Sequence, residues 1–70
     1  MNEPLIDYEV ALLDNNGNNL ITAYCIGRKE ARSVYHRWAT IFRSGGYAED
    51  VAEVAFKHDG TTLTTTKDDR

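Results

Sequence analysis

The chain has 70 residues, of which 41% are hydrophobic and 27% charged, and its net charge is −3. This length has room for one domain, and the composition is that of a globular protein rather than a disordered one. No stretch approaches the roughly 18 apolar residues of a membrane span, and the start does not read as a secretory signal. One cysteine, Cys25, cannot form an internal disulfide. We therefore expect a single cytoplasmic domain over residues 1–70, with flexible tails at 1–4 and 67–70 and no membrane contact.

Residues 5–13 and 20–26 have the pattern of two paired strands. In LIDYEVALL, side chains alternate with a period of two, and acidic residues lie on one side, as in a half-buried strand. Asn16-Gly17 favours a two-residue hairpin turn, because both positions accept positive φ angles. Such a turn places apolar residues opposite one another: Leu12 faces Ile21, Val10 faces Ala23, and Tyr8 faces Cys25.

Residues 28–43 change to the period of an α-helix. One apolar stripe runs along it, formed by Ala31, Val34, Tyr35, Trp38, Ile41 and Phe42. Gly27 is the expected N-cap. Ser44-Gly45-Gly46 is expected to end the helix, because glycine accepts the left-handed conformation that follows a last turn.

Residues 50–58 and 61–66 predict a second pair of strands around Asp59-Gly60, another strong hairpin signal. A two-residue turn there sets Phe56 opposite Leu63. The element order is strand, strand, helix, strand, strand. It predicts an α+β two-layer sandwich, with one helix packed on a four-stranded, mainly antiparallel sheet. The order of the strands within the sheet does not follow from the pattern.

The titratable side chains show no arrangement that carries out a reaction. His36 falls on the side of the helix away from the apolar stripe and His58 beside a turn, so both are expected to be solvated. A metal site needs three or four converging ligands, and nucleophilic catalysis needs an oriented base. Cys25 falls on the buried side of its strand and is expected to act as a small hydrophobe. We therefore expect a non-enzymatic protein without a metal or cofactor.

Positive charge is concentrated in the helix. Residues 28–43 hold five cations and one acid, a net charge of +4, so the rest of the chain carries −7. Several of the cations lie near the N-terminus of the helix, where its dipole favours anions, so helix stability does not explain them. The candidate contact residues on the helix are Lys29, Arg32, Arg37 and Arg43. The alternative is an ordinary solvated helix surface.

The sheet face away from the helix is the second candidate surface, because one helix cannot cover both faces. The expected members of this face are Asp7, Glu9, Leu13, Leu20, Tyr24, Ile26 and, less directly, Val51 and Glu53. An apolar patch bordered by charge is typical of an interaction surface. The candidate partner-binding residues here are Asp7, Glu9, Tyr24 and Glu53. A homodimer that buries this face is an alternative.

Two classes of partner fit these surfaces. A protein partner is favoured by the small size, the half-apolar acidic face and the overall acidity. A nucleic acid bound through residues 28–43 is the alternative, and the net charge of −3 opposes it. We expect a binding protein that occupies the working surface of a larger macromolecule, either a host protein or a nucleoprotein complex.

The layout also resembles that of known small proteins. LIDYEVALL, NNGNN and LITAYCI are followed by GRKEARSVYHRWATIFRSGG and VAEVAFKHDGTTLTTT. In size and element order this is similar to the small α+β proteins of phages and mobile elements, such as anti-CRISPR proteins and a phage inhibitor of bacterial RNA polymerase. The resemblance covers residues 5–66, in element order only, and carries no diagnostic motif. It implies an inhibitor that acts by occupying a host protein's surface, without chemistry.

Overall fold

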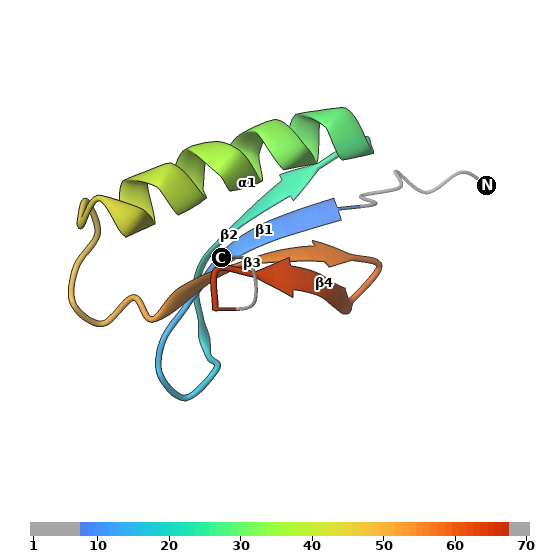
Figure 1. The fold of residues 1–70 in the computed structure, drawn as a ribbon. Coiled ribbons are helices and arrows are strands. Elements are labelled where there is room, and N and C mark those ends of the chain that lie inside the picture. The colour runs from blue at the N-terminus through green and yellow to red at the C-terminus, as the bar shows by residue number, and fades with distance from the viewer. Residues whose placement is uncertain (1–7, 68–70) are drawn as a thin grey trace.

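The computed structural model describes residues 8–67 and confirms the predicted α+β architecture. Asp7 and most of the two expected tails lie outside the described residues. The elements are β1 (Tyr8–Leu13), β2 (Asn19–Cys25), α1 (Arg28–Arg43), β3 (Glu53–His58) and β4 (Thr61–Thr65). The strands form one antiparallel sheet in the order β2-β1-β3-β4, and α1 lies across one face (Figure 1). β2 and β4 are therefore the two edge strands.

Both ends of α1 follow the predicted signals. Gly27 is the N-cap, with a φ of 94°, and its carbonyl accepts the first helical hydrogen bond from the Ala31 N–H. At the other end Gly45 takes a φ of +80°. The Gly46 N–H donates to the Ile41 carbonyl at 2.8 Å and the Gly45 N–H to the Phe42 carbonyl at 3.1 Å, the two bonds of a Schellman motif.

The main core lies between α1 and the sheet. Ala31, Tyr35 and Ala39 are the buried residues of the helix, and Ala39 is a member that the predicted stripe omitted. The two alanines let the helix approach the sheet closely, whereas the Tyr35 ring packs against Phe56 with centroids 5.6 Å apart. The sheet contributes Val10, Leu12, Cys25, Val54 and Phe56.

The first hairpin has the predicted register but not the predicted turn. Tyr8 pairs with Cys25 and Leu12 with Ile21, as a two-residue turn would require. The loop is longer, however, because the Asp14 N–H donates to the Asn18 carbonyl and the Gly17 N–H to the Asp14 carbonyl. Leu13 then pairs with Asn19, and an irregularity between Leu12 and Leu13 leaves Leu20 as an extra residue in β2. This bulge restores the register that the longer loop shifts.

The second hairpin has the predicted turn but not the predicted register. Asp59 and Gly60, with φ angles of 53° and 82°, form the predicted two-residue turn. The predicted pairing of Phe56 with Leu63 is wrong, because a shift between Phe56 and Lys57 sets Phe56 opposite Thr64. Leu63 is the extra residue of this bulge. Both edge strands thus carry one bulge, each at a leucine.

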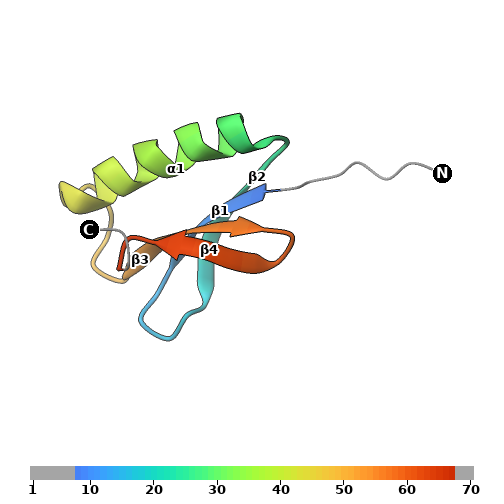
Figure 2. The same cartoon turned by 45° about the vertical axis from the view of Figure 1, so that its right-hand side comes forward.

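The sheet twists strongly beneath the helix. The end of β2 that leads into α1 lies close to the helix, whereas the β1–β2 turn projects away from it (Figure 2). α1 contacts β3, β1 and β2. A single helix, about 10 Å across, covers roughly two strands spaced about 4.8 Å apart. The first half of β2 is therefore left uncovered on the helix side as well.

Candidate functional site

The structure brings together some, but not all, of the predicted residues on the sheet face away from α1. Glu9 lies in β1 directly opposite Tyr24 of β2 and Lys57 of β3. Tyr24 is exposed, whereas Glu9 and Lys57 are half-buried. Glu53 is on the same face at the other end of the sheet, opposite Leu13. Glu9 and Tyr24 therefore form one contact area, and Glu53 stands apart from it.

Two of the apolar residues expected on this face, Leu13 and Val51, are not exposed on it. Leu13 is buried with Ala11 and Ala55 in a second small cluster, and these two alanines are fully inaccessible. Val51 packs against the core beneath α1 rather than on the opposite face. The prediction that Leu13 and Val51 belong to the exposed surface of this face is therefore wrong.

The other expected apolar residues, Leu20, Tyr24 and Ile26, are exposed, and they lie along β2 or directly after it. In residues 8–67, five large hydrophobic side chains are exposed, and four of them fall at positions 20–26: Leu20 (40%), Ile21 (57%), Tyr24 (61%) and Ile26 (68%). Ile21 is the member that the sequence did not indicate, since it pairs with the buried Leu12 and faces the helix side. The sequence did contain one indirect indication of this exposure. A single helix is narrower than a sheet of four strands, so it cannot cover every residue on its own side of the sheet. We call these four residues the β2 apolar strip.

The predicted cations of α1 are divided between its two flanks. Lys29 and Arg37 lie on the flank toward β2, where they border a hollow of about 650 Å³. Ile26 and Val34 are its apolar lining, and Ser33 and Glu30 complete most of its wall. We call this depression the β2–α1 hollow. It joins one end of the β2 apolar strip to the basic helix.

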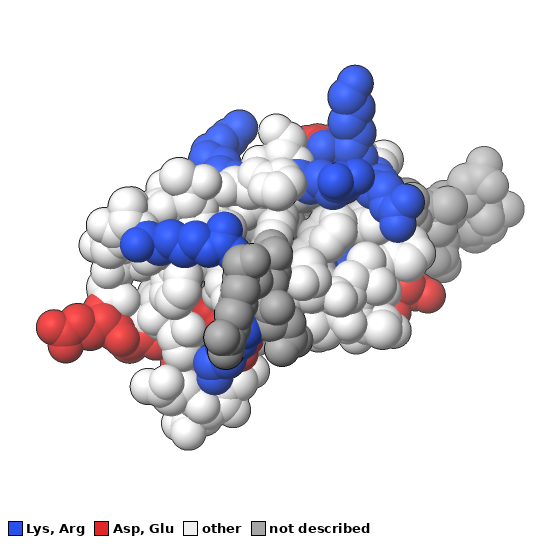
Figure 3. Space-filling view, in the orientation of Figure 1, with Lys and Arg blue, Asp and Glu red and all other residues white. Residues whose placement is uncertain are grey.

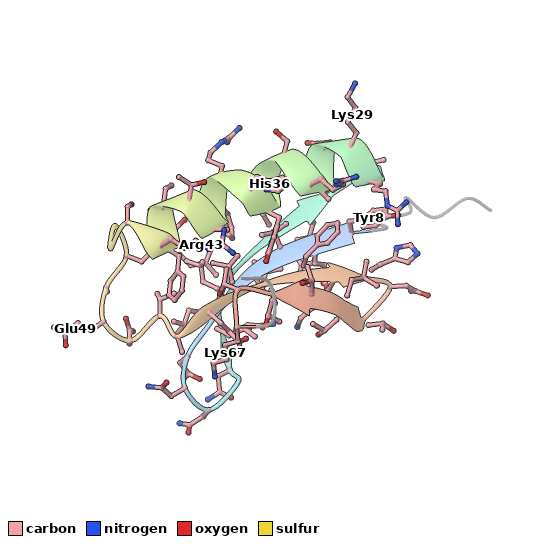
Figure 4. All side chains as sticks on the ribbon, viewed as in Figure 1. Tyr8, Lys29, His36, Arg43, Glu49 and Lys67 are labelled. Carbon is pink, nitrogen blue, oxygen red and sulfur yellow. The ribbon has the colours of Figure 1, made fainter. Side chains whose placement is uncertain are left out.

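Arg32 lies on the opposite flank. Together with His36 it borders a smaller hollow of about 290 Å³ over Tyr35, Phe56 and Thr64. Figure 4 shows Lys29 pointing away from the sheet at the start of α1, with Arg43 near its other end. Lysine and arginine side chains are accordingly spread along the helix rather than gathered in one patch (Figure 3). The predicted basic face is two separate flanks.

The two histidines and the cysteine pack against neighbouring side chains of the fold. The His58 ring stacks on Tyr8 with centroids 4.4 Å apart, and His36 lies edge-on to Tyr35 at 6.0 Å. Cys25 is buried as predicted, and burial, followed by the charge of Glu30, raises the pKa of its thiol. Within residues 8–67, no group of three or more His, Cys, Asp or Glu side chains is placed to hold a metal ion.

Asp14 organises the turn of the first hairpin. Its Oδ1 accepts hydrogen bonds from the backbone N–H groups of Asn16 and Asn18, both at 2.9 Å. These bonds, that of Asn18 first, lower the pKa of the Asp14 carboxyl. The charge therefore stabilises the loop from which β2 begins.

Comparisons with protein-family models, with curated proteins and with solved structures find no match for this chain. In the part of the chain that the structure describes, no helix has both the length and the apolar character needed to cross a membrane.

Proposed function

We propose that the chain is a non-enzymatic binding protein that occupies the working surface of a larger protein or nucleoprotein complex. The observation that carries this proposal is the concentration of exposed apolar side chains at residues 20–26, which hold four of the five large hydrophobic side chains exposed in residues 8–67. Exposed apolar surface bordered by charge is characteristic of interaction sites. The similarity in element order to small phage inhibitors agrees with this mode of action.

The β2–α1 hollow is the proposed contact point. Ile26 and Val34 offer an apolar lining to an inserted side chain, and Lys29 and Arg37 supply positive charge at its border. The matching partner surface has a protruding apolar or aromatic residue with an acidic group beside it. Of the predicted contact residues, Lys29 and Arg37 border the hollow, and Tyr24 lies near the same end of β2 as Ile26.

The test is capture of the partner from a lysate of the source cells, with and without nuclease, by the intact chain and by charge variants. Ile26→Glu and Arg37→Glu are expected to lose the captured protein. Arg32→Glu makes the same change of charge on the other flank of α1 and is expected to keep it. Equal loss with Arg32→Glu would refute the assignment to the hollow.

A nucleic acid is the second candidate, favoured by the exposed cations Arg28, Lys29, Arg32 and Arg37 along α1. In that case affinity for DNA or RNA falls steeply with added salt, because each phosphate contact releases counterions. Arg32→Glu and Arg37→Glu would then weaken binding alike. Loss of the captured partner after nuclease treatment would favour this candidate over the protein.

A further inference from the structure

β2 is an edge strand with little of the usual protection against pairing. Residues 15–27 contain no charged side chain and no proline, although charges and prolines are the common means of protecting sheet edges. The bulge of β2 lies at Leu20, close to its hairpin end, so residues 21–25 form a regular ladder with β1. In β4 the bulge at Leu63 interrupts the middle of the strand instead.

From this edge we propose that two copies of the chain pair antiparallel along β2, so that their two four-stranded sheets form one continuous sheet. If the pairing is centred on Ala23, the regular stretch 21–25 is matched completely with itself. Thr22 of each copy then lies opposite Tyr24 of the other, on the face away from α1. Ile21 lies opposite Cys25 on the helix side. Pairing along this edge gives hydrogen-bond partners to the backbone N–H and C=O groups at the edge of β2. It also covers exposed apolar side chains.

The opposite charges at the two ends of the uncharged stretch 15–27 favour a second copy as the occupant. Two chains of net charge −3 repel one another, so an interface between them is most favourable where charge is absent. The uncharged stretch ends in Asp14 on one side and in Arg28 and Lys29 on the other. Antiparallel pairing exchanges the two ends, which brings the acidic end of one copy toward the basic end of the other. Parallel pairing would bring like charges together.

The pairing would also change the proposed binding site. The two-fold axis of an antiparallel strand pair is perpendicular to the sheet, so both helices lie on the same face, one on each side of the seam. Because the two β2 strands run in opposite directions, the two β2–α1 hollows would lie at opposite ends of the seam. This consequence rests on the proposed function, whereas the pairing itself does not.

The pairing is tested with the purified chain alone, so its failure is distinct from failure of the proposed partner. Sedimentation over a range of concentrations should show the mass rise from 7.9 kDa toward twice that value. The double variant Thr22→Lys/Tyr24→Lys should raise the dissociation constant by about tenfold or more, because like charges then oppose across the seam. Thr61→Lys/Leu63→Lys adds the same charge to the other edge strand and should leave the constant unchanged.

A charge-reversal experiment separates pairing from misfolding. Thr22→Glu/Tyr24→Glu should be monomeric alone, and mixing it with the lysine variant should restore a dimer. In the unaltered chain, amide exchange in residues 21–25 should slow with rising concentration, while that in β4 should not. A chain that stays at 7.9 kDa throughout, a mixture that stays monomeric, or equal dissociation by the β4 variant would overturn the proposal.

Discussion

Leu12 and Leu20 belong to the same hairpin but have opposite surroundings. Leu12 is buried in the main core, whereas Leu20 is the exposed extra residue of the β2 bulge. We expect Leu12→Ala to lower the free energy of unfolding by about 2–5 kcal/mol, since it removes buried apolar contacts and leaves a cavity. Leu20→Ala should change the same quantity by less than about 0.5 kcal/mol. Equilibrium unfolding in urea measures both, and equal effects would contradict the assigned strand faces.

The carboxyl of Asp14 makes stability depend on pH in acid. Its pKa is lowered in the folded chain by the backbone hydrogen bonds of the loop. The stability that the ionised group contributes is therefore fully present above its ordinary pKa of 3.8, and is lost as the pH falls through the lowered folded pKa. Asp14→Asn should be less stable than the native chain at pH 7, and the difference should vanish in strong acid.

Urea unfolding at several pH values measures the effect of Asp14→Asn. Asp50→Asn, which changes an exposed carboxylate outside the loop, is the control. A difference between the native chain and Asp14→Asn that persists unchanged into strong acid would show that the charge of Asp14 is not responsible.

The end of α1 depends on the left-handed conformation of Gly45. No atom lies within 4 Å of an added Cβ at this position, so the cost of a substitution comes from its φ of +80° alone. We expect Gly45→Ala to lower the free energy of unfolding by about 1–2 kcal/mol. Gly45→Asn should cost less, because asparagine tolerates this conformation better. Thermal unfolding compares the two variants, and an equal loss would mean that φ is not the cause.

The bounds of the helix follow closely from the sequence, whereas the third strand begins at Glu53, three residues later than predicted, and the pairing details were not predicted. The helix begins and ends at the predicted residues, because glycines mark both of its ends. The two bulges were not predictable, since each depends on how the strand fits its neighbour rather than on local sequence. The prediction of a two-residue turn at Asn16-Gly17 gave the correct register only because Leu20, the extra residue of the bulge, compensates for the longer loop.

The candidate site was predicted less completely for a related reason. Tyr24 and Ile26 were placed correctly as exposed, and the alternation within β1 placed Glu9 on the face of Tyr24. The exposure of Ile21 depends on which strands the helix covers, and the burial of Leu13 depends on how the strands pack on the opposite face. The sequence pattern specifies neither of these properties of the assembled layers.

Over the whole molecule, we expect amide hydrogens to be protected most strongly against exchange in the two inner strands. β1 and β3 pair with a strand on each side, and Val10, Ala11, Val54 and Ala55 are fully buried in them. We expect their amide hydrogens to exchange at rates set by global unfolding, and those of β4 to exchange faster through local opening. Hydrogen exchange followed by NMR tests this order. Equally slow exchange in β4 would contradict it.

The position of β1 at the centre of the sheet has a consequence for biosynthesis. β1 is made first, but its ladder with β3 begins only when Glu53 and the residues after it have left the ribosome. Until then the emerging hairpin and helix have no Val54 or Phe56 against which to bury Tyr35 and Leu12. During translation the apolar sides of the first hairpin and of α1 therefore stay without their β3 partners, and native packing is reached only once the second hairpin has been added.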